Sequence, residues 1–393
     1  MKKTNFRLIV QSLFLAFVLA AVFIFREHAE AWCPFGGVET IYTYAKTGKM
    51  VCSLAVSNIY ILISVLLLTL LLRRVFCGYA CPIGAISTLL RKGAAKIGIK
   101  QIHVTGKVDR VLRLLKYVVL AVILYVTWTH SELYFRTADP CYALISRHGE
   151  DITFFAYIVL GLIILVSLFI MMPFCRWFCP LAAVMNPISR FGFSKIKRDT
   201  DVCIDCGKCS KICPMEIDVA NVKTVNDASC MSCGDCIEGC PVKDKGALKL
   251  NFIRTIPRPR IVAVIVMIAL FAGAVLAVNF FDIPSYIHVH DDPQGHGELE
   301  TLEMNVTGVN CNGSAMLFVF FLERDDIYEL PGYFKVEAWP HPDTARVKIH
   351  YDTEKADETM IYEAVTEAYY DPIDERWRVS PFQIEGYDPL MLE

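Results

Sequence analysis

Two cysteine runs decide the fold of this chain: residues 203–214 read CIDCGKCSKICP, and residues 230–241 read CMSCGDCIEGCP. Each run holds four cysteines, so eight thiols fall within residues 203–240. Ordinary core packing does not need this density, because a free cysteine in a core is a small apolar side chain among many others. The runs therefore predict a bound inorganic group.

Both runs have the spacing C-x2-C-x2-C-x3-C-P, which is the spacing of bacterial ferredoxins that hold two [4Fe–4S] clusters. Three closely spaced thiolates wrap one cluster, and the fourth, before a proline, turns toward the second cluster. Zinc sites seldom use this triple spacing twice, and a reducing compartment disfavours disulfides. The expected ligands are Cys203, Cys206, Cys209 and Cys240 for cluster 1, and Cys213, Cys230, Cys233 and Cys236 for cluster 2.

The composition indicates a membrane protein with at least one soluble domain. Apolar residues make up 54% of the 393 residues, above the roughly 45–50% of soluble domains. The formal net charge of −2 gives no reason to expect a nucleic-acid partner. Five apolar runs reach the length of about 20 residues that a transmembrane helix needs: 6–25, 54–72, 112–129, 152–172 and 261–281.

Loop charges predict the orientation of the bundle, because cytoplasmic loops carry an excess of Lys and Arg. Basic residues precede the first run, fill the loop that begins at Arg73 and Arg74, and flank the cysteine-rich segment. We therefore expect the N-terminus and this segment in the cytoplasm, and residues 282–393 outside an inner (cytoplasmic) membrane. Arg113 and Lys116, at the start of the third run, are expected to reach the interface. The first run could instead be a cleaved signal peptide.

The membrane part contains an internal repeat, because FC-x3-CP follows both the second and the fourth apolar run. The unit is a helix, an outer loop with one cysteine, a second helix and an inner C-x3-CP. Two copies predict a four-helix bundle with a pseudo-twofold axis along the membrane normal. The inner cysteines would then either bind a metal or a third cluster, or simply turn the chain before a proline. They are Cys77, Cys81, Cys175 and Cys179.

The outer loops contribute Cys33 and Cys141, for which two interpretations stay open. They could form a disulfide between the repeats on an oxidising side of the membrane, or they could act as a redox relay. No local ligand set accompanies either residue. Cys52, alone at the start of the second run, is expected to serve packing.

The C-terminal sequence predicts a small α+β domain with the order βαββαβ, the split βαβ arrangement. Strand-like alternation occurs at 299–308, within 333–352 and at 376–387, and helical stretches occur at 312–324 and 357–370. This domain resembles the heavy-metal-associated domain, with TGVNCNGS in the place of the metal loop. That family uses a C-x2-C pair, whereas this chain has Cys311 and Ser314. Two interpretations stay open: the loop binds a metal, or the domain has lost its metal site and serves only to dock a partner.

The predicted linker before this domain, HVHDDPQGHGE at 288–298, is rich in potential ligands. Its side chains could bind Cu(II) or Zn(II), or they could be functionless parts of a polar linker. They are His288, His290, His296, Asp291 and Asp292.

The two FC-x3-CP motifs followed by the two-cluster segment resemble the NapH/MauN-type membrane ferredoxins, and the same block occurs in NosR-type and CcoG-type proteins. The resemblance covers roughly residues 1–256. It implies a membrane electron-transfer subunit and redox roles for the C-x3-CP cysteines. The NapH type is associated with electrons from quinol, and the CcoG type with copper reduction. The chain departs from the NapH pattern after residue 260, so the electron acceptor is not implied.

The sequence thus predicts a five-helix membrane bundle with an inserted two-cluster ferredoxin domain and a C-terminal α+β domain. The first functional hypothesis is electron transfer between the quinone pool or a cytoplasmic donor and an extracytoplasmic redox partner, as a component of a quinol dehydrogenase. The second is a copper reductase or maturation factor, and the third is a scaffold with structural clusters. The predicted domains are 1–195 (membrane), 196–256 (ferredoxin), 257–283 (fifth helix), 284–297 (linker) and 298–393 (α+β).

Overall fold

The computed structural model describes residues 6–24, 32–47, 55–130, 139–145, 154–251, 259–280, 283–290, 299–324, 330–341, 343–371 and 376–387. The chain divides into two compact units. The membrane unit comprises residues 1–39 and 57–279, and the C-terminal unit comprises residues 40–56 and 280–393.

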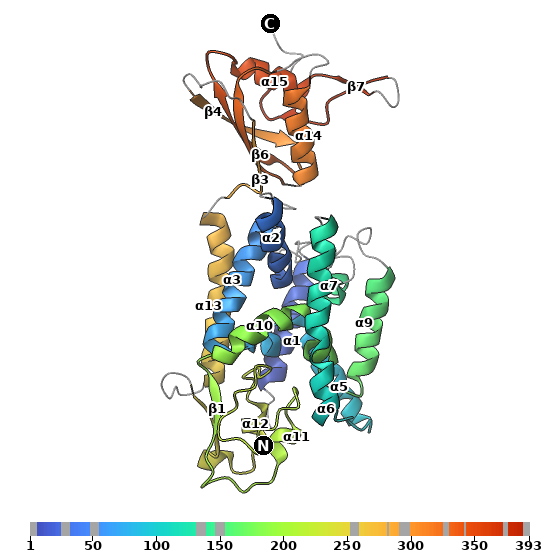
Figure 1. The fold of residues 1–393 in the computed structure, drawn as a ribbon, viewed down its shortest axis with the longest axis vertical. Helices are drawn as coiled ribbons and strands as arrows, with labels where there is room; N and C mark the ends of the chain where they lie inside the picture. The colour runs from blue at the N-terminus through green and yellow to red at the C-terminus, as the bar shows by residue number, and fades with distance from the viewer. Residues whose placement is uncertain are drawn as a thin grey trace. The chain divides into compact units, whose positions relative to one another are not determined.

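The membrane unit is built on apolar helices that run side by side (Figure 1). Three segments are long and apolar enough to cross a membrane: Phe6–Phe23, Gly106–Thr129 and Arg260–Val278. They correspond to α1 (Phe6–Phe23), to α6 (Gly106–Leu112) with α7 (Leu115–His130), and to α13 (Pro259–Phe280). The other two predicted spans form apolar helices of shorter length, α3 (Ala55–Leu72) and α9 (Phe154–Ser167).

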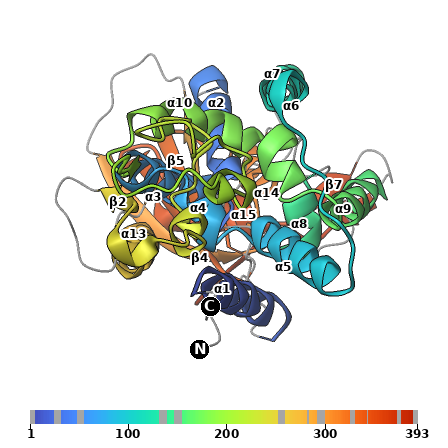
Figure 2. The ribbon, with the colours of Figure 1, turned by 90° about the horizontal axis from the view of Figure 1, so that it is seen from below.

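Shorter helices fill the ends of the bundle. Figure 2 shows α4 near the middle of the helices when the molecule is seen from below. Cys81 and Cys179 each have extended backbone, with a proline at the first position of the helix that follows. A proline fits there because that position needs no intrahelical N–H bond. These elements are α2 (Pro34–Thr47), α4 (Val75–Tyr79), α5 (Pro82–Lys96), α8 (Pro140–Ile145), the π-helix Phe174–Phe178 and α10 (Pro180–Phe191).

Several basic residues that were expected in open loops or at the interface are in fact buried. Arg73 and Arg74 are both 0% exposed. The Arg73 guanidinium donates to the backbone oxygens of Val225 and Asp227 at 2.8 and 2.5 Å. Lys116 is 1% exposed, and Arg113, which is partly buried, donates to the Met215 oxygen at 2.7 Å. These charges hold the cysteine-rich segment onto the helices, a role that a count of loop charges cannot reveal.

The ferredoxin-type segment (residues 195–251) is mostly loop. Its ends pair as the antiparallel strands β1 (Lys195–Arg198) and β2 (Leu248–Asn251). Between them lie α11 (Lys208–Lys211), α12 (Asp235–Glu238) and a 3-10 turn at Lys243–Lys245. Gly207 and Gly234 precede α11 and α12 with φ of 66° and 70°, where glycine is favoured. The two cysteine runs thus repeat in conformation as well as in sequence.

The C-terminal unit is a five-stranded antiparallel sheet in the order β3-β5-β6-β4-β9, and two helices share its core. In chain order the strands are β3 (Tyr286–Val289), β4 (Leu299–Thr307), β5 (Tyr333–Trp339), β6 (Ala345–Asp352) and β9 (Gln383–Ile384). The helices are α14 (Asn312–Glu323) and α15 (Glu358–Thr366). Elements β4 to β9 follow the order strand, helix, strand, strand, helix, strand, with a small hairpin before the last strand.

Two expectations for this unit were wrong. Part of the predicted linker forms β3, which pairs with β5 and buries Tyr286. The predicted last strand at 376–387 divides into β8 (Arg376–Arg378) and β9. β8 pairs with β7 (Tyr369–Asp371), and β9 pairs with β4. Pro381 lies between β8 and β9, and a proline cannot donate to a continuous ladder.

Candidate iron–sulfur sites

Two cavities in the ferredoxin-type segment are each lined by one of the predicted ligand sets. A cavity of about 340 Å³ is lined by Cys213, Cys230, Cys233 and Cys236. A second cavity of about 350 Å³ is lined by Cys203, Cys206, Cys209 and Cys240. The fold therefore brings together three cysteines of one run with the last cysteine of the other run, as crossed ligation requires.

Local backbone geometry explains how each run wraps its cavity. Asp205 and Ser232 have φ of 51° and 48°, although neither is a glycine. Each lies just before the second cysteine of its run, and a left-handed glycine follows that cysteine. Left-handed residues on both sides of one cysteine curl the chain tightly, so the neighbouring thiols can face one centre. The cysteine spacing and these left-handed positions together shape the two cavities.

The chemistry of the cavities fits iron–sulfur clusters. Besides its cysteines, the 340 Å³ cavity is lined by apolar side chains such as Ile217 and Val225. Burial raises the pKa of the Cys213 and Cys233 thiols to about 12. Such thiols lose their protons only when a cation takes the protons' place, as thiolate–metal bonding does. Three buried thiols and the half-buried Cys213 around one apolar cavity therefore suit a thiolate-bound cluster.

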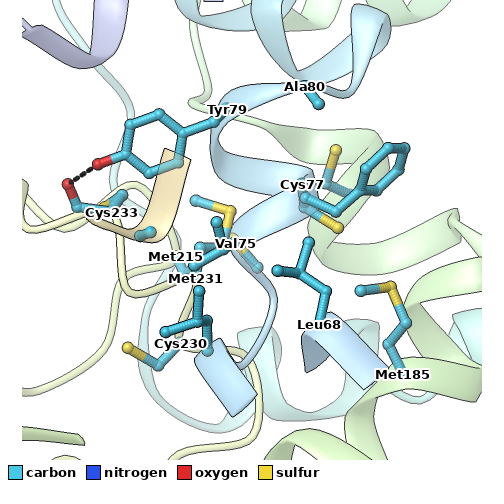
Figure 3. Packing of buried hydrophobic residues seen from close by; sticks show 14 of the residues in the cluster. Leu68, Val75, Cys77, Tyr79, Ala80, Met185, Met215, Cys230, Met231 and Cys233 are labelled. Atoms are coloured by element: carbon cyan, nitrogen blue, oxygen red, sulfur yellow. Dashed lines mark hydrogen bonds between the residues drawn. The ribbon is translucent and has the colours of Figure 1, made fainter. Parts of the chain in front are cut away.

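The cavity of cluster 2 lies against the first C-x3-CP motif. The Tyr79 hydroxyl, which is buried, donates a hydrogen bond to the Cys233 backbone oxygen at 3.0 Å (Figure 3). A Cβ atom at Gly78 would lie 3.5 Å from Met231 and 3.7 Å from the Cys233 Cβ, so the two backbones are in close approach. A ligand of cluster 2 and the segment between Cys77 and Cys81 are therefore neighbours.

Arg7 of α1 strengthens this contact. Its guanidinium donates to the Gly78 backbone oxygen at 3.1 Å and pairs with Asp235, the residue before Cys236. The Arg7 side chain is only 3% exposed. Cluster 1 has no comparable cover, since Cys206 is exposed and Cys203 and Cys240 are half-buried. The two cavities are thus unequal, one facing the helices and the other facing solvent.

The four C-x3-CP cysteines come together around a buried arginine. The Cys81 and Cys175 side chains are neighbours. Cys77 and Cys179 are electrostatic neighbours of Arg74. Arg74 lies with its Nη2 3.8 Å from the Cys77 sulfur and 3.3 Å from the Cys175 backbone oxygen. The Nε and Nη1 atoms of Arg74 are buried without a hydrogen-bond acceptor. The site thus has spare positive charge directed at a group of thiols.

The outer-loop cysteines are free thiols, so the predicted disulfide between them is not found. Cys33 precedes α2 and packs against the main core of the membrane unit. Cys141 lies in α8 and packs against Val22. Cys141 has Cys33, Cys81 and Cys179 among its electrostatic neighbours. Cys141 therefore has both Cys33 and two C-x3-CP cysteines among its neighbours, and the relay interpretation remains a prediction. Cys52 lies outside the described residues.

The C-terminal unit places Cys311 and the two described linker histidines at opposite ends of α14. Cys311 caps the first turn of α14 and is exposed, with the Ser314 hydroxyl 3.7 Å from its sulfur. Burial raises the pKa of Cys311, but hydrogen bonds from Ser314 outweigh this and lower it overall. His288 and His290 instead meet Glu323, at the opposite end of α14. His296, Asp291 and Asp292 lie outside the described residues.

Sequence reasoning missed the charged residues that surround the thiols. Arg74 lies directly before the first FC-x3-CP motif, and this adjacency was a usable signal. Arg7 and Asp235 are 228 residues apart in sequence, and no local pattern links them. Glu323 lies within the helical stretch predicted at 312–324, and the sequence gives no sign that His288 and His290 pack beside it.

Comparisons with known proteins agree with this picture. A family profile described as "4Fe-4S binding domain" matches residues 54–100 and 152–199, and one described as "4Fe-4S dicluster domain" matches residues 195–241. The first profile covers both C-x3-CP motifs, and the second covers both cysteine runs. The chain thus contains ferredoxin-type iron–sulfur domains.

Relatives with similar sequences share this part of the chain. YccM of Escherichia coli K12 is 30% identical over 199 residues, which is 48% of this chain and 55% of YccM. MJ0750 of Methanocaldococcus jannaschii is 33% identical over 189 residues, 48% of this chain and 74% of that protein. The ferredoxin-type protein NapH of Haemophilus influenzae is 29% identical over 157 residues, 39% of this chain and 51% of NapH.

The chain spans about half the length of YccM and of NapH. No solved structure matches the chain. The two profiles, the cysteine geometry and the matched relatives agree on one assignment. The chain belongs to the NapH/NosR-type family of membrane iron–sulfur proteins.

Proposed function

We propose that the protein is a membrane electron-transfer protein, in which a solvent-facing cluster, a buried cluster and the C-x3-CP cysteines lie along one electron route. Each [4Fe–4S] cluster supplies one-electron exchange when bound. The proposed ligands are Cys203, Cys206, Cys209 and Cys240 for cluster 1, and Cys213, Cys230, Cys233 and Cys236 for cluster 2.

The observation that carries this proposal is the contact between Cys233 and the first C-x3-CP motif. The Tyr79 hydrogen bond and the close approach at Gly78 join a ligand of cluster 2 to the segment between Cys77 and Cys81. Arg7 and Arg73 hold that contact with buried hydrogen bonds. A cluster with a purely structural role would need no such attachment to a second group of thiols.

The difference in exposure supports an order along the route. Cys206 is exposed, and Ile204 beside it is 58% exposed, so a partner can approach cluster 1 from solvent. Three of the four cysteines of cluster 2 are buried and Cys213 is half-buried, whereas cluster 1 has one buried cysteine, Cys209. We infer that an external partner exchanges electrons with cluster 1, and that cluster 2 connects cluster 1 to the membrane part.

Arg74 supports a third redox centre at Cys77, Cys81, Cys175 and Cys179. A buried guanidinium with two orphan nitrogens is costly unless an anion compensates it. Thiolates around iron provide negative charge at that place, whereas four neutral thiols provide none. The orphan nitrogens of Arg74 therefore favour ligation over simple chain turning at the C-x3-CP motifs.

The partners and the sidedness follow from the family resemblance and from the loop charges. We propose the membrane quinone pool or a cytoplasmic protein as the donor, and a redox protein outside the membrane as the acceptor. In this arrangement the ferredoxin-type segment is cytoplasmic. Because α13 crosses the membrane between the two parts, the C-terminal unit lies on the opposite side of the membrane. A metal reductase or maturation factor is the second candidate, because His288, His290 and Glu323 of the C-terminal unit lie together.

Iron and sulfide content tests the proposal. Protein purified without oxygen should contain about twelve irons and as many sulfides per chain if all three centres form, and about eight if the C-x3-CP cysteines bind none. A quinol analogue or a low-potential ferredoxin should then bleach the cluster absorbance. Colourless protein without inorganic sulfide would overturn the proposal. Clusters that no donor or acceptor turns over would favour the scaffold hypothesis.

A further inference from the structure

Strand β3 of the C-terminal unit contains His288, and His290 directly follows its last residue, Val289. His288 and His290 are separated by one residue, and alternate residues of a strand share a face. β3 pairs with β5, and His288 lies opposite Val336 in this pairing. Beyond the end of β3, the His290 N–H donates to the Phe334 oxygen at 2.9 Å. The sheet therefore fixes the spacing of the two imidazole rings.

A carboxylate completes the group from another element. Glu323 is the last residue of α14, and its Oε1 lies 3.0 Å from the His288 Nε2 and 3.3 Å from the His290 Nδ1. The Tyr333 hydroxyl also donates to this oxygen, and the Tyr333 ring centroid lies 4.7 Å from that of His290. Two histidines, a carboxylate and a phenol thus converge from β3, α14 and β5.

The spacing of these atoms matches that of ligands around one ion. The three ligand atoms all lie within 4.8 Å of one another, and no other group of three His, Cys, Asp or Glu ligands does so in the part of the chain that the structure describes. Ligands about 2.1 Å from a tetrahedral Zn²⁺ are about 3.4 Å apart. The measured separations of 3.0 and 3.3 Å are close to this value.

Charge and exposure suit an entering cation. Glu323 brings a carboxylate to the site, and its Oε1 accepts a hydrogen bond from the Tyr333 hydroxyl. The side chains of His288, His290 and Glu323 are 24%, 44% and 36% exposed. An ion can therefore enter from solvent, and water can occupy its remaining coordination positions.

We propose that His288, His290 and Glu323 form a binding site for Cu²⁺ or Zn²⁺. Two imidazoles with one carboxylate suit these ions, whereas Mg²⁺ and Ca²⁺ prefer sites made of oxygen alone. Cys311 does not belong to this site, because α14 has 12 residues and separates its two ends by about 18 Å. The site is independent of the clusters and of the incomplete C-x2-C loop.

Titration of the full-length protein in detergent, with its clusters oxidised, tests the site. Oxidised [4Fe–4S] clusters give no EPR signal, so added Cu²⁺ can be observed directly. We expect one tightly bound equivalent whose spectrum shows hyperfine splitting from two imidazole nitrogens, and Zn²⁺ should displace it. The double variant His288→Ala/His290→Ala should lose this equivalent. The isosteric Glu323→Gln should weaken the binding by about tenfold or more.

Two matched control variants accompany this test. Cys311→Ser removes the cysteine that was also considered as a ligand, and His350→Ala removes a histidine of β6 that is not part of the site. Both variants should bind copper like the wild type. Circular dichroism and iron content should be unchanged in every variant. Absence of stoichiometric binding in the wild type would overturn the proposal. So would binding that persists in the double variant, or binding that shows sulfur ligation and disappears in Cys311→Ser.

Discussion

Arg74 is the residue that most strongly links charge to function in the membrane unit. Its guanidinium is 0% exposed and touches the Cys77 sulfur, while two of its nitrogens have no acceptor. We predict that Arg74→Gln lowers the iron content from about twelve to about eight atoms per chain, because the anionic third centre loses its counter-charge. Iron and sulfide assays together with EPR of the reduced protein would measure this loss.

Arg74→Lys is the matched control, because lysine keeps the positive charge but lacks the planar guanidinium group of arginine. It should retain more of the third centre than Arg74→Gln does. The two ferredoxin-type clusters should be intact in both variants. If Arg74→Gln keeps its full iron content and an unaltered spectrum, the arginine is a packing residue and the argument for the third centre fails.

Tyr79 supplies a hydrogen bond whose removal can be measured as stability. Its hydroxyl is the donor to the Cys233 oxygen at 3.0 Å, in a place closed to water. Tyr79→Phe should lower the free energy of unfolding by about 1–3 kcal/mol, since a buried carbonyl loses its partner. Thermal unfolding, followed through cluster absorbance, would detect it. Tyr117→Phe, at a half-exposed position on α7, should have a smaller effect.

At the residue scale, spacing grouped the thiols as the two cavities group them, whereas the charged neighbours of the thiols were not predicted. The cysteine sets 203/206/209/240 and 213/230/233/236 were assignable because ligand spacing is a local property of the chain. Arg7, Arg74 and Glu323 act through contacts between distant segments. Hydropathy and charge patterns place such residues on a surface by default, because burial of a charge depends on a partner that is not local.

The helices of the membrane unit depend on glycine where α2 crosses α3. A Cβ atom at Gly37 would meet the Asn58 backbone oxygen and would lie 2.8 Å from the Leu62 Cβ. Gly37→Ala should therefore destabilise the membrane unit by about 1–3 kcal/mol, because backbone atoms cannot move aside cheaply. The midpoint of thermal unfolding in detergent would report this effect.

Gly161 provides the matched control on α9, because a Cβ atom there would meet nothing within 4 Å. Gly161→Ala should leave the unfolding midpoint unchanged or raise it slightly, since alanine is the better helix former. Equal midpoints for Gly37→Ala and Gly161→Ala would show that α2 does not need the close approach.

At the element scale, long periodic segments were predictable and short ones were not. The helix at 312–323 and the strands at 299–307 and 345–352 matched their sequence patterns closely. β3 was read as a linker, because its four residues lie between polar, Pro- and Gly-containing stretches. β3 is a strand because it pairs with β5, and four residues are too few to show the alternation from which a strand is predicted.

For the whole molecule, the proposed route requires the two clusters to be unequal. Cys206→Ser should remove about four irons, those of the solvent-facing cluster, and should leave the segment attached to the helices. Cys233→Ser should remove the buried cluster and also loosen the segment, because the loop whose backbone oxygen accepts the Tyr79 hydrogen bond then loses the cluster that shapes it. Iron assays and the rate of limited proteolysis within residues 195–251 would separate these outcomes.

Either variant should stop electron flow from a soluble donor to the C-x3-CP centre, since both interrupt the same route. Rapid mixing with a reduced donor would show this. A Cys206→Ser protein that still reduces the membrane centre at the wild-type rate would contradict the proposed order. Equal protease sensitivity in the two variants would contradict the attachment through Cys233.

The arrangement across the membrane can be tested through Cys311, which is exposed and has a lowered thiol pKa. One span, α13, separates the ferredoxin-type segment from the C-terminal unit in sequence, so the two should lie on opposite sides. A membrane-impermeant maleimide should label wild-type protein in intact spheroplasts and should not label Cys311→Ser.

In a Cys311→Ser background, Asp244→Cys, an exposed position beside cluster 1, should be labelled only after permeabilisation. Labelling of Asp244→Cys in intact spheroplasts would place the clusters outside and reverse the proposed direction of the route, whereas failure to label Cys311 until the membrane is opened would place the C-terminal unit inside.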